Sequence, residues 1–411
     1  MRAITFEGPI PRYLATLVAG KLSAALYVGP HACTRYREIA SPDLPGDDWV
    51  RIRTRMGGIC GSDIGIVSLE ASPSSSPFSS FPFVIGHENV GTIAELGRGV
   101  RDCAVGERVT VNPLLCCEPR AVSPPCEACS TGHHSRCTHF TDGAVPPGML
   151  IGTTRSTGGS WGEEFVAHRS QLVRVGEQMT DEEAVLTEPL ACCVHAVRGA
   201  IPAPDERALV IGAGTMGLLM TAALHALAPR TAVTVLARHG FQAGHATRLG
   251  AVRTVLARGG YLGELAEAGR TRLLKPILGP PIGVGGFDRS YVCVGGRRGV
   301  EDALRFTRSG GTVVLLGNVS TLSGVDWTPL WLKELTVLGT LAYGAHADEH
   351  ALAHGGAGVS AFVEASQIIA SGNAPVGALV THVFGLGEYR RALGVARGKG
   401  GSESVKVAFK F

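Results

Sequence analysis

The chain has 411 residues, of which 45% are hydrophobic and 18% are charged, and its formal net charge is +3. This length allows two or three globular domains, and the composition excludes disordered and fibrous proteins. The small net charge, without any block of lysine and arginine, argues against a nucleic-acid partner. The N-terminus lacks the apolar run of a signal peptide, and no apolar stretch reads as a membrane span. We therefore expect a cytoplasmic protein without a membrane partner.

The first part of the chain, to about residue 180, alternates short β-rich segments with glycine and proline. Strand periodicity is found at residues 48–54, 107–111 and 162–167. Many short strands separated by turn residues predict a barrel-like β domain. Residues 9–30 and the Ser/Pro-rich residues 71–82 look like insertions into this pattern.

Strands and helices alternate from about residue 208 onward. The expected strands cover residues 208–211, 232–236, 289–294, 312–316 and 336–339, with a helix at 218–227. Buried strands that alternate with helices predict a parallel, doubly wound sheet. Before it, a capping box at residues 180–183 predicts one helix start, and Glu188-Pro189 predicts another. Beyond about residue 345 the pattern is mixed and ends in a strand at 404–409.

A glycine pattern, G-x-G-x-x-G, lies between the first of these strands and its helix, at residues 212–217. Gly212 permits the tight turn, Gly214 lets the backbone approach a pyrophosphate, and Gly217 allows close helix–strand packing. Thr215 and Met216 open the helix, whose N-terminus supplies N–H donors and a favourable dipole. The segment predicts a dinucleotide site, although such glycines can also serve packing alone.

The end of the second strand indicates which dinucleotide binds. An acidic residue there would accept hydrogen bonds from the adenosine ribose and favour NAD. The expected position is Ala237, followed by Arg238 and His239. Basic side chains suit a 2′-phosphate, so we expect NADP to be preferred over NAD, unless Arg238 merely faces solvent.

Five of the 11 cysteines lie between Cys116 and Cys137. Cys126, Cys129 and Cys137 have the spacing C-x2-C-x7-C, and Cys117 lies a short loop upstream. Four thiolates can close a tetrahedral zinc shell with no open position, which describes a structural site. Cys116 competes with Cys117 for the first position, histidines of the same loop could substitute, and chance clustering of buried cysteines is the alternative.

A second set of possible ligands is dispersed along the chain. Cys60 offers a thiolate with the Ser62 hydroxyl two residues on, His87 and Glu88 offer an imidazole and a carboxylate, and Glu188 lies at a helix start. Three ligands of mixed type with one open position are what catalytic zinc requires. Spacing alone does not unite these residues, because each type also has ordinary structural uses.

The chain resembles a known family through several motifs together. A signature of zinc-containing alcohol dehydrogenases is present as Gly86-His87-Glu88-x2-Gly91-x5-Gly97-x2-Val100. With Cys60-Gly61-Ser62-Asp63, the cysteine-rich lobe, Glu188-Pro189-Leu190 and the glycine pattern, the chain resembles the zinc-dependent medium-chain dehydrogenase/reductase superfamily. It looks most like the branch with sorbitol, threonine and glucose dehydrogenases. The resemblance covers nearly the whole chain, in the right order.

The resemblance implies an α/β protein with a GroES-like β-barrel catalytic domain and a doubly wound Rossmann domain. It implies a zinc-binding catalytic domain at residues 1–200, the Rossmann domain at 201–345, and a segment at 346–411 that completes the catalytic domain. It also implies homodimers or homotetramers joined through the nucleotide domains.

The resemblance further implies two zinc ions, one catalytic and one structural. Cys60 and His87 would bind the catalytic ion, with Glu188 or Glu88 as the third ligand, because family members differ at this point. The activity implied is hydride transfer between NAD(P) and an alcohol or carbonyl substrate held on the metal.

Two neighbouring residues match further roles of the family. Ser62 matches the hydroxyl that begins a proton relay, and Asp63 matches the partner that orients the ligand histidine. Two other functions stay open: a reductase of an imine or enal in a specialised pathway, and a non-catalytic NADPH-binding protein. The presence of residues for an open metal site argues against a non-catalytic NADPH-binding protein, because nucleotide binding alone needs no such site.

Overall fold

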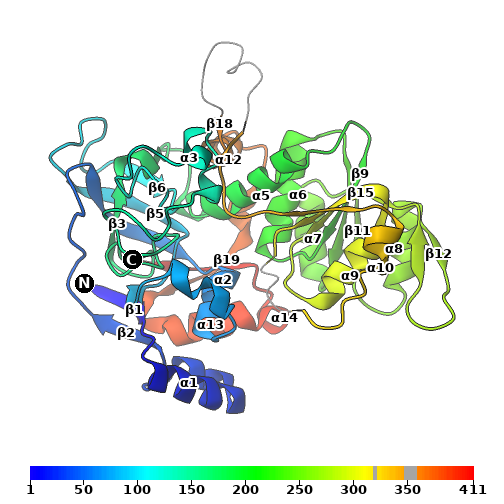
Figure 1. Ribbon diagram of the computed structural model, residues 1–411, viewed down its shortest axis with the longest axis horizontal. Helices are drawn as coiled ribbons and strands as arrows, with labels where there is room; N and C mark the ends of the chain where they lie inside the picture. Colours follow the sequence, from blue (N-terminus) through cyan, green and yellow to red (C-terminus); the bar gives the residue numbers. More distant parts are fainter. Residues whose placement is uncertain (318–321, 347–358) are drawn as a thin grey trace, which may run out of the picture. The chain divides into compact units, whose positions relative to one another are not determined.

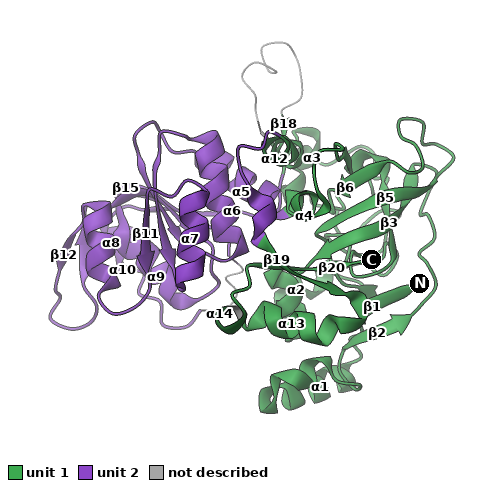
Figure 2. Ribbon diagram, turned by 180° about the vertical axis from the view of Figure 1, so that it is seen from behind, with its two compact units in different colours: residues 1–188, 344–370, 380–411 green, residues 189–343, 371–379 purple. Residues whose placement is uncertain are grey.

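The computed structural model describes residues 1–317, 322–346 and 359–411, and the chain forms two compact units (Figure 2). The first unit contains Met1–Glu188, Gly344–Ala370 and Val380–Phe411. The second contains Pro189–Tyr343 and Ser371–Leu379. The chain thus crosses between units after Glu188, Tyr343, Ala370 and Leu379. The sequence predicted boundaries near residues 200 and 345 only, and it assigned the whole of 346–411 to the catalytic domain, although Ser371–Leu379 belongs to the second unit.

The first unit is built on a seven-stranded sheet (Figure 1). Its strands are β3 (Trp49–Gly58), β5 (Asn89–Leu96), β6 (Arg108–Val111), β7 (Glu164–His168), β8 (Leu172–Arg174), β19 (Val380–Gly385) and β20 (Lys406–Lys410). The order is β19-β20-β3-β5-β6-β8, and β7 also pairs with β3. All pairs are antiparallel except β19 with β20.

Alternation along β3 explains why this sheet has a buried face. Val50, Ile52 and Met56 are buried, whereas Arg53 and Arg55 between them are exposed. Because successive side chains of a strand point to opposite faces, one face joins the core and the other meets water. The strand predicted at residues 48–54 is therefore present, and it extends four residues further, to Gly58.

The end of the chain completes the sheet formed by its beginning. Strand β20 lies between β19 and β3, and Ala408 pairs with Gly58 and Lys410 with Met56. This pairing places the C-terminal segment in the first unit and brings Lys406 beside the residues that follow β3.

Smaller elements surround the main sheet of the first unit. A three-stranded sheet joins β2 (Thr34–Glu38), β1 (Arg2–Phe6) and β4 (Phe83–Val84), and a two-stranded one joins β17 (Ala345–His346) and β18 (Val359–Ser360). The helices are α1 (Ile10–Leu22), α2 (Gly61–Val67), α3 (Glu127–Ser130), α4 (Asp181–Ala184), α12 (Ala361–Ala370), α13 (Tyr389–Arg397) and α14 (Lys399–Ser402). Short 3₁₀ turns are η1 (Ala24–Val28), η2 (Pro73–Phe78), η3 (His134–Arg136), η4 (Arg169–Gln171) and η6 (Leu386–Glu388). The two apparent insertions thus form α1 with η1, and η2.

The predicted capping box is present at the start of α4. The Thr180 backbone N–H donates to Glu183 Oε2 at 2.9 Å, and the Glu183 N–H donates to Thr180 Oγ1 at 3.2 Å. Two N–H groups that the helix itself cannot satisfy are bonded in this way.

The second unit is the predicted doubly wound parallel sheet. Its strands are β9 (Arg207–Ile211), β10 (Ala232–Ala237), β11 (Arg253–Leu256), β14 (Phe287–Val292), β15 (Thr307–Leu315) and β16 (Thr336–Gly339), in the order β11-β10-β9-β14-β15-β16. Its helices are α5 (Thr187–Gly199, which begins in the first unit), α6 (Thr215–Leu227), α7 (Gly240–Arg248), α8 (Tyr261–Gly269), α9 (Arg297–Phe306) and α10 (Thr328–Leu332), with η5 (Val376–Leu379) and a hairpin of β12 (Arg272–Leu274) and β13 (Ile282–Val284). The strand order reverses at β9, the place where open α/β sheets bind ligands.

The described helices include none that is both long and apolar enough to cross a membrane.

Candidate metal and cofactor sites

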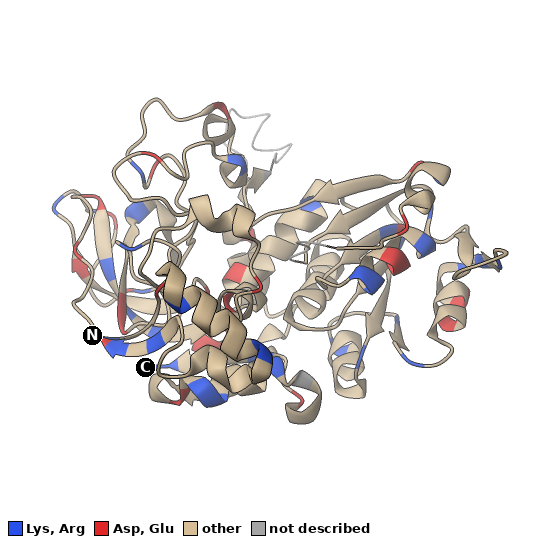
Figure 3. Ribbon diagram, turned by 60° about the horizontal axis from the view of Figure 1, so that its bottom comes forward, with Lys and Arg blue, Asp and Glu red and all other residues tan. Residues whose placement is uncertain are grey.

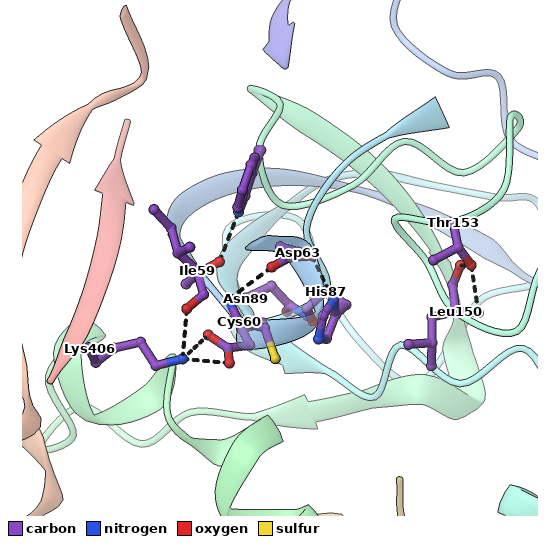
Figure 4. Close-up of polar contacts among 11 residues, drawn as sticks. Ile59, Cys60, Asp63, His87, Asn89, Leu150, Thr153 and Lys406 are labelled. Carbon is purple, nitrogen blue, oxygen red and sulfur yellow. Dashed lines mark hydrogen bonds and ion pairs between the residues drawn. The ribbon is translucent and has the colours of Figure 1, made fainter. Parts of the chain in front are cut away.

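The turn into helix α2 joins the first two predicted site residues. Cys60 precedes the helix, and its backbone N–H donates to Asp63 Oδ2 at 2.9 Å. The other oxygen of this buried carboxylate, Oδ1, lies 3.3 Å from His87 Nδ1. Asp63 therefore fixes the loop that presents the Cys60 thiol and orients the imidazole at the same time (Figure 4).

Backbone constraints hold the segment that carries His87. Gly86 has φ +102°, and a Cβ at this position would collide with Trp161, so only glycine fits. The Asn89 side chain donates to His87 O at 3.0 Å and to Val111 O at 2.9 Å, and accepts from Val111 N at 2.8 Å. These contacts fix the position of the imidazole relative to the main sheet.

His87 is buried beside two acidic groups. Burial lowers its pKa, but the Asp63 carboxylate and the Cys60 thiol, both hydrogen-bonded to it, outweigh burial and raise the pKa well above the ordinary value. The imidazole and the thiol therefore lie near each other, as two ligands of one ion would.

Glu88 forms a buried ion pair that the sequence did not predict. Lys406 Nζ lies 2.6 Å from both Oε1 and Oε2 of Glu88, and it also donates to Ile59 O at 3.2 Å (Figure 4). Both side chains are buried. Burial lowers the pKa of Lys406, but the Glu88 carboxylate outweighs it and raises that pKa. Gly58 leaves the room that this pair needs, because a Cβ there would collide with Glu88 Oε2.

Glu188 belongs to the same cluster. It is the second residue of α5 and is buried. Burial raises its pKa, the positive charges of His87 and Lys406 act against this, and Glu88 adds to the rise. These interactions require Glu188 to lie near His87 and Glu88. Ser62, the second residue of α2, is half-buried.

The donor set of this cluster suits a catalytic zinc ion: one thiol, one imidazole and a carboxylate. The ligand atoms of this cluster lie further apart than those of a closed metal site. Among the residues that the structure describes, the only group of three or more such side chains with all ligand atoms within 4.8 Å of one another is the four-cysteine group. Glu188 or Glu88 therefore has to approach Cys60 and His87 further to complete a three-ligand shell.

The four-cysteine group has the geometry of a closed zinc site. Cys117, Cys126, Cys129 and Cys137 place their sulfur atoms within 4.8 Å of one another. Cys117 Sγ and Cys137 Sγ are 3.6 Å apart, close to the separation of about 3.8 Å that tetrahedral ligands at 2.3 Å require. Cys116 is buried but is not part of this group.

Burial and backbone N–H groups act in opposite directions on the thiols of this loop, because burial raises the pKa of Cys129 and Cys137. Burial of Cys126 is outweighed by N–H groups of Thr138 and Cys129, which lower its pKa to about 5. Burial raises the pKa of Cys116 to about 11, which favours a protonated thiol. The grouping of the four sulfur atoms, which leaves Cys116 out, supports Cys117 as the first position of the lobe.

Arg120 fixes the loop around the four cysteines. Its guanidinium is buried and donates to Leu115 O at 2.8 Å, Asp142 O at 2.8 Å and Val145 O at 2.7 Å. It also donates to the carbonyls of Pro146 and Gly148. One side chain thus satisfies five carbonyl groups of a loop that has little secondary structure of its own.

The glycine pattern forms the tight strand-to-helix turn that a dinucleotide site needs. Gly212 has φ +98°, and Gly214 directly precedes α6, which begins at Thr215. A Cβ at Gly217 would collide with Gly212 O, so glycine is required for this close approach. Met216 is the second residue of α6, and in the first turn of a helix the backbone N–H groups have no partner within the helix and point toward its N-terminus.

The second strand of the sheet ends as expected. Ala237 is the last residue of β10 and is buried, while Arg238 after it is exposed. His239 precedes α7; its N–H donates to Gln242 Oε1 at 3.2 Å, and its ring stacks on Phe241 at 5.7 Å. No acidic side chain follows β10 at these positions.

Two residues of these sites were missed by the sequence analysis, Lys406 and Arg120. Lys406 lies in an alternating terminal strand, where a lysine normally faces solvent. Arg120 lies between cysteines in a polar loop. The position of Lys406 among the apolar residues Val405, Val407 and Phe409 was a signal that this lysine could face inward. The local sequence around Arg120 contained no comparable signal.

Comparisons with known proteins agree with this geometry. Residues 46–177 match the family model "Alcohol dehydrogenase GroES-like domain", and residues 214–354 match "Zinc-binding dehydrogenase". The chain is 28% identical to a sorbitol dehydrogenase of Arabidopsis thaliana over 88% of each chain. It is 27% identical to D-arabinitol dehydrogenase 1 of Uromyces fabae over 90% of this chain and 93% of that protein. An NADP-bound zinc-binding dehydrogenase structure from Sinorhizobium meliloti is 25% identical, with a TM-score of 0.69 over 92% of this chain and 95% of the other.

The role of Arg120 can be tested by Arg120→Met. Loss of its donors leaves buried carbonyls unbonded, so we expect the free energy of unfolding to fall by roughly 3–5 kcal/mol and the lobe to lose its zinc. Urea unfolding and zinc content measure the two effects. Arg155→Met, at an exposed arginine of the same unit, is the control and should change neither. Full zinc retention in Arg120→Met would contradict this role.

Proposed function

Because this chain belongs to the zinc-dependent medium-chain alcohol dehydrogenase family, we propose that Cys60, His87 and Glu188 hold its catalytic zinc and that it oxidises a polyhydroxylated alcohol with NADP. The coarser activity, that of a zinc-dependent NAD(P) oxidoreductase acting on CH–OH groups, follows from the family and from its polyol dehydrogenase relatives. An enzyme of this kind needs a metal site with one open position for the substrate. A protein that only binds the nucleotide does not need such a site.

The ion pair of Lys406 with Glu88 supports Glu188 as the third ligand. Both oxygens of Glu88 are engaged by one buried ammonium group. Moving Glu88 onto the metal would leave that ammonium buried without its partner, which costs about 3–5 kcal/mol. Glu188 is buried in the same cluster and interacts with His87, so it is the better third donor.

Each residue of the cluster then has a chemical task. Zinc, when bound, acts as a Lewis acid on the alcohol oxygen and lowers the pKa of the alcohol. The Ser62 hydroxyl, two residues from Cys60, accepts the alcohol proton and passes it toward solvent. Asp63 keeps the His87 ring in its ligand orientation. NADP, when bound, would supply the acceptor for the hydride of the carbinol carbon, so that the alcohol would lose one proton and one hydride and become a carbonyl.

Support for the substrate and cofactor comes from different sources. The relatives named for sorbitol and arabinitol act on polyols, and this likeness extends over about nine tenths of the chain. The exposed Arg238 after β10 can meet a 2′-phosphate, and the Sinorhizobium meliloti structure contains NADP. We also propose a homodimer or homotetramer, which the edge strand β16 and the exposed Trp331 support.

The third ligand can be identified by comparing two variants. Glu188→Ala should lose one zinc equivalent, keep the structural one, and lower kcat/KM at least about a hundredfold. The double variant Glu88→Gln/Lys406→Met removes the buried pair together and should keep both zinc ions. Metal analysis of the purified proteins decides: if the double variant loses zinc and Glu188→Ala keeps it, Glu88 is the ligand.

The proton relay predicts a separable effect at Ser62. Ser62→Ala should lower kcat by about a hundredfold to ten-thousandfold, because no hydroxyl accepts the alcohol proton. Zinc content and the Kd of NADP should stay unchanged, and Ser62→Thr, which keeps the hydroxyl, should retain most of the activity. Equal kcat in Ser62→Ala and the parent enzyme would remove the relay role.

Cofactor preference depends on Arg238 in this proposal. Arg238→Ala should raise the KM for NADP about tenfold, through loss of a charge-assisted contact with the 2′-phosphate, and leave the KM for NAD nearly unchanged. Arg248→Ala, which removes an arginine from the end of α7, is the matched control. If Arg238→Ala raises the KM for NADP and the KM for NAD by the same factor, Arg238 does not bind the 2′-phosphate.

A further inference from the structure

Helix α1 has an apolar outer face that neither the fold nor the sites use. The helix belongs to the apparent insertion at residues 9–30 and lies outside both segments that match the family models. It forms an outer edge of the first unit (Figures 1 and 2). Its surface is therefore a property of this chain that the family does not explain.

The inner face of α1 fixes how the helix is rotated. Tyr13 and Leu17 pack against a hydrophobic core cluster of the first unit, and Thr16 and Gly20 are buried. A Cβ at Gly20 would collide with the Tyr27 ring, so the helix lies as close to η1 as glycine permits. The opposite face consequently points outward.

The outer face carries a ridge of large apolar side chains. Its members, four residues apart, are Ile10 (74% exposed), Leu14 (54%), Val18 (65%) and Leu22 (83%). The adjacent row is made of small residues, Pro11, Ala15 and Ala19. A ridge of large side chains beside a row of small ones forms a shallow groove, which is the surface relief that packs against another helix.

We propose that this face binds the same face of a second copy of this chain. Around a two-fold axis near the middle of the helix, the ridge of one copy enters the groove of the other, with the helices antiparallel and crossed. In a two-fold contact residue i meets residue j and j meets i, so Leu14 of each copy meets the partner's Val18. The surface is complementary to itself, as such a contact requires.

Area and charge favour a second copy over a membrane surface. A specific interface should cover at least about 1,000 Å² in total. The ridge supplies four large apolar side chains from each copy, each more than half exposed, toward that area. Helices that bind membrane surfaces are rich in lysine and arginine. Within Ile10–Leu22, Lys21 is the only exposed charged side chain, because Arg12 is half-buried and paired with Glu7. Figure 3, in which this side comes forward, shows how few charged positions the helix has.

The test is the mass of the full-length enzyme in solution, measured by light scattering after gel filtration. Whether the α1 contact alone makes a dimer or joins two dimers formed through β16 into a tetramer, Leu14→Glu and Val18→Lys should each halve the mass of the assembly. Mixing the two proteins should restore it, since the carboxylate introduced in one copy then meets the ammonium group introduced in the other, beside an intact Leu14–Val18 contact. Ala15→Phe should also halve the mass, because it fills the groove without removing apolar area.

Controls separate this contact from general effects. Val105→Glu, at an exposed apolar residue outside α1 (62% exposed), should leave the mass unchanged, and all variants should keep the Tm and alcohol dehydrogenase activity of the parent. The proposal is overturned if the parent is a monomer, if the α1 variants keep the parent's mass, if mixing restores nothing, or if the parent sediments with phosphatidylserine vesicles and Leu14→Glu does not.

Discussion

A buried ion pair between Lys406 and Glu88 joins the last strand of the chain to the residue beside the proposed zinc ligand His87. A buried ammonium group and a buried carboxylate are stable only when they pair with each other. This pair therefore requires β20 to lie against β3 and the Glu88 side chain to face inward. The same requirement keeps His87 in place, since it directly precedes Glu88 in a segment that Gly86 and Asn89 also fix. The position of the metal cluster therefore depends on the position of strand β20.

The two proposed metal sites are assembled in different ways. The four cysteines come from one loop, with Arg120 bonded to the surrounding carbonyls, so their approach needs only short loop closures. The catalytic cluster takes Cys60 from a helix start, His87 from a segment after β4, Glu188 from α5 and Lys406 from β20. A cluster collected from four distant segments depends on the whole unit being folded. It is also wider than the cysteine group, which suits a site that must admit a substrate oxygen.

The sequence predicted features that depend on near neighbours. The glycine turn at 212–217, the capping box at Thr180 and the C-x2-C-x7-C spacing are each set within a few residues, and each is present. Lys406 and Glu88 are 318 residues apart, so no local pattern could pair them. Choosing between Glu88 and Glu188 needed that pair, because both carboxylates look equivalent in the sequence. The family resemblance supplied the order of the motifs, but not the Lys406 partner of Glu88 on which the proposal of Glu188 as the third ligand rests.

The proposed zinc ligand set is tested most directly by a crystal structure of the zinc-loaded enzyme with anomalous diffraction recorded at the zinc edge. It predicts one zinc peak among the four cysteines, and a second within about 2.0–2.3 Å of Cys60 Sγ, a His87 ring nitrogen and a Glu188 oxygen. Glu88 should remain bonded to Lys406. A second peak bound by Glu88 with Lys406 displaced, or no peak near His87 in active enzyme, would contradict it.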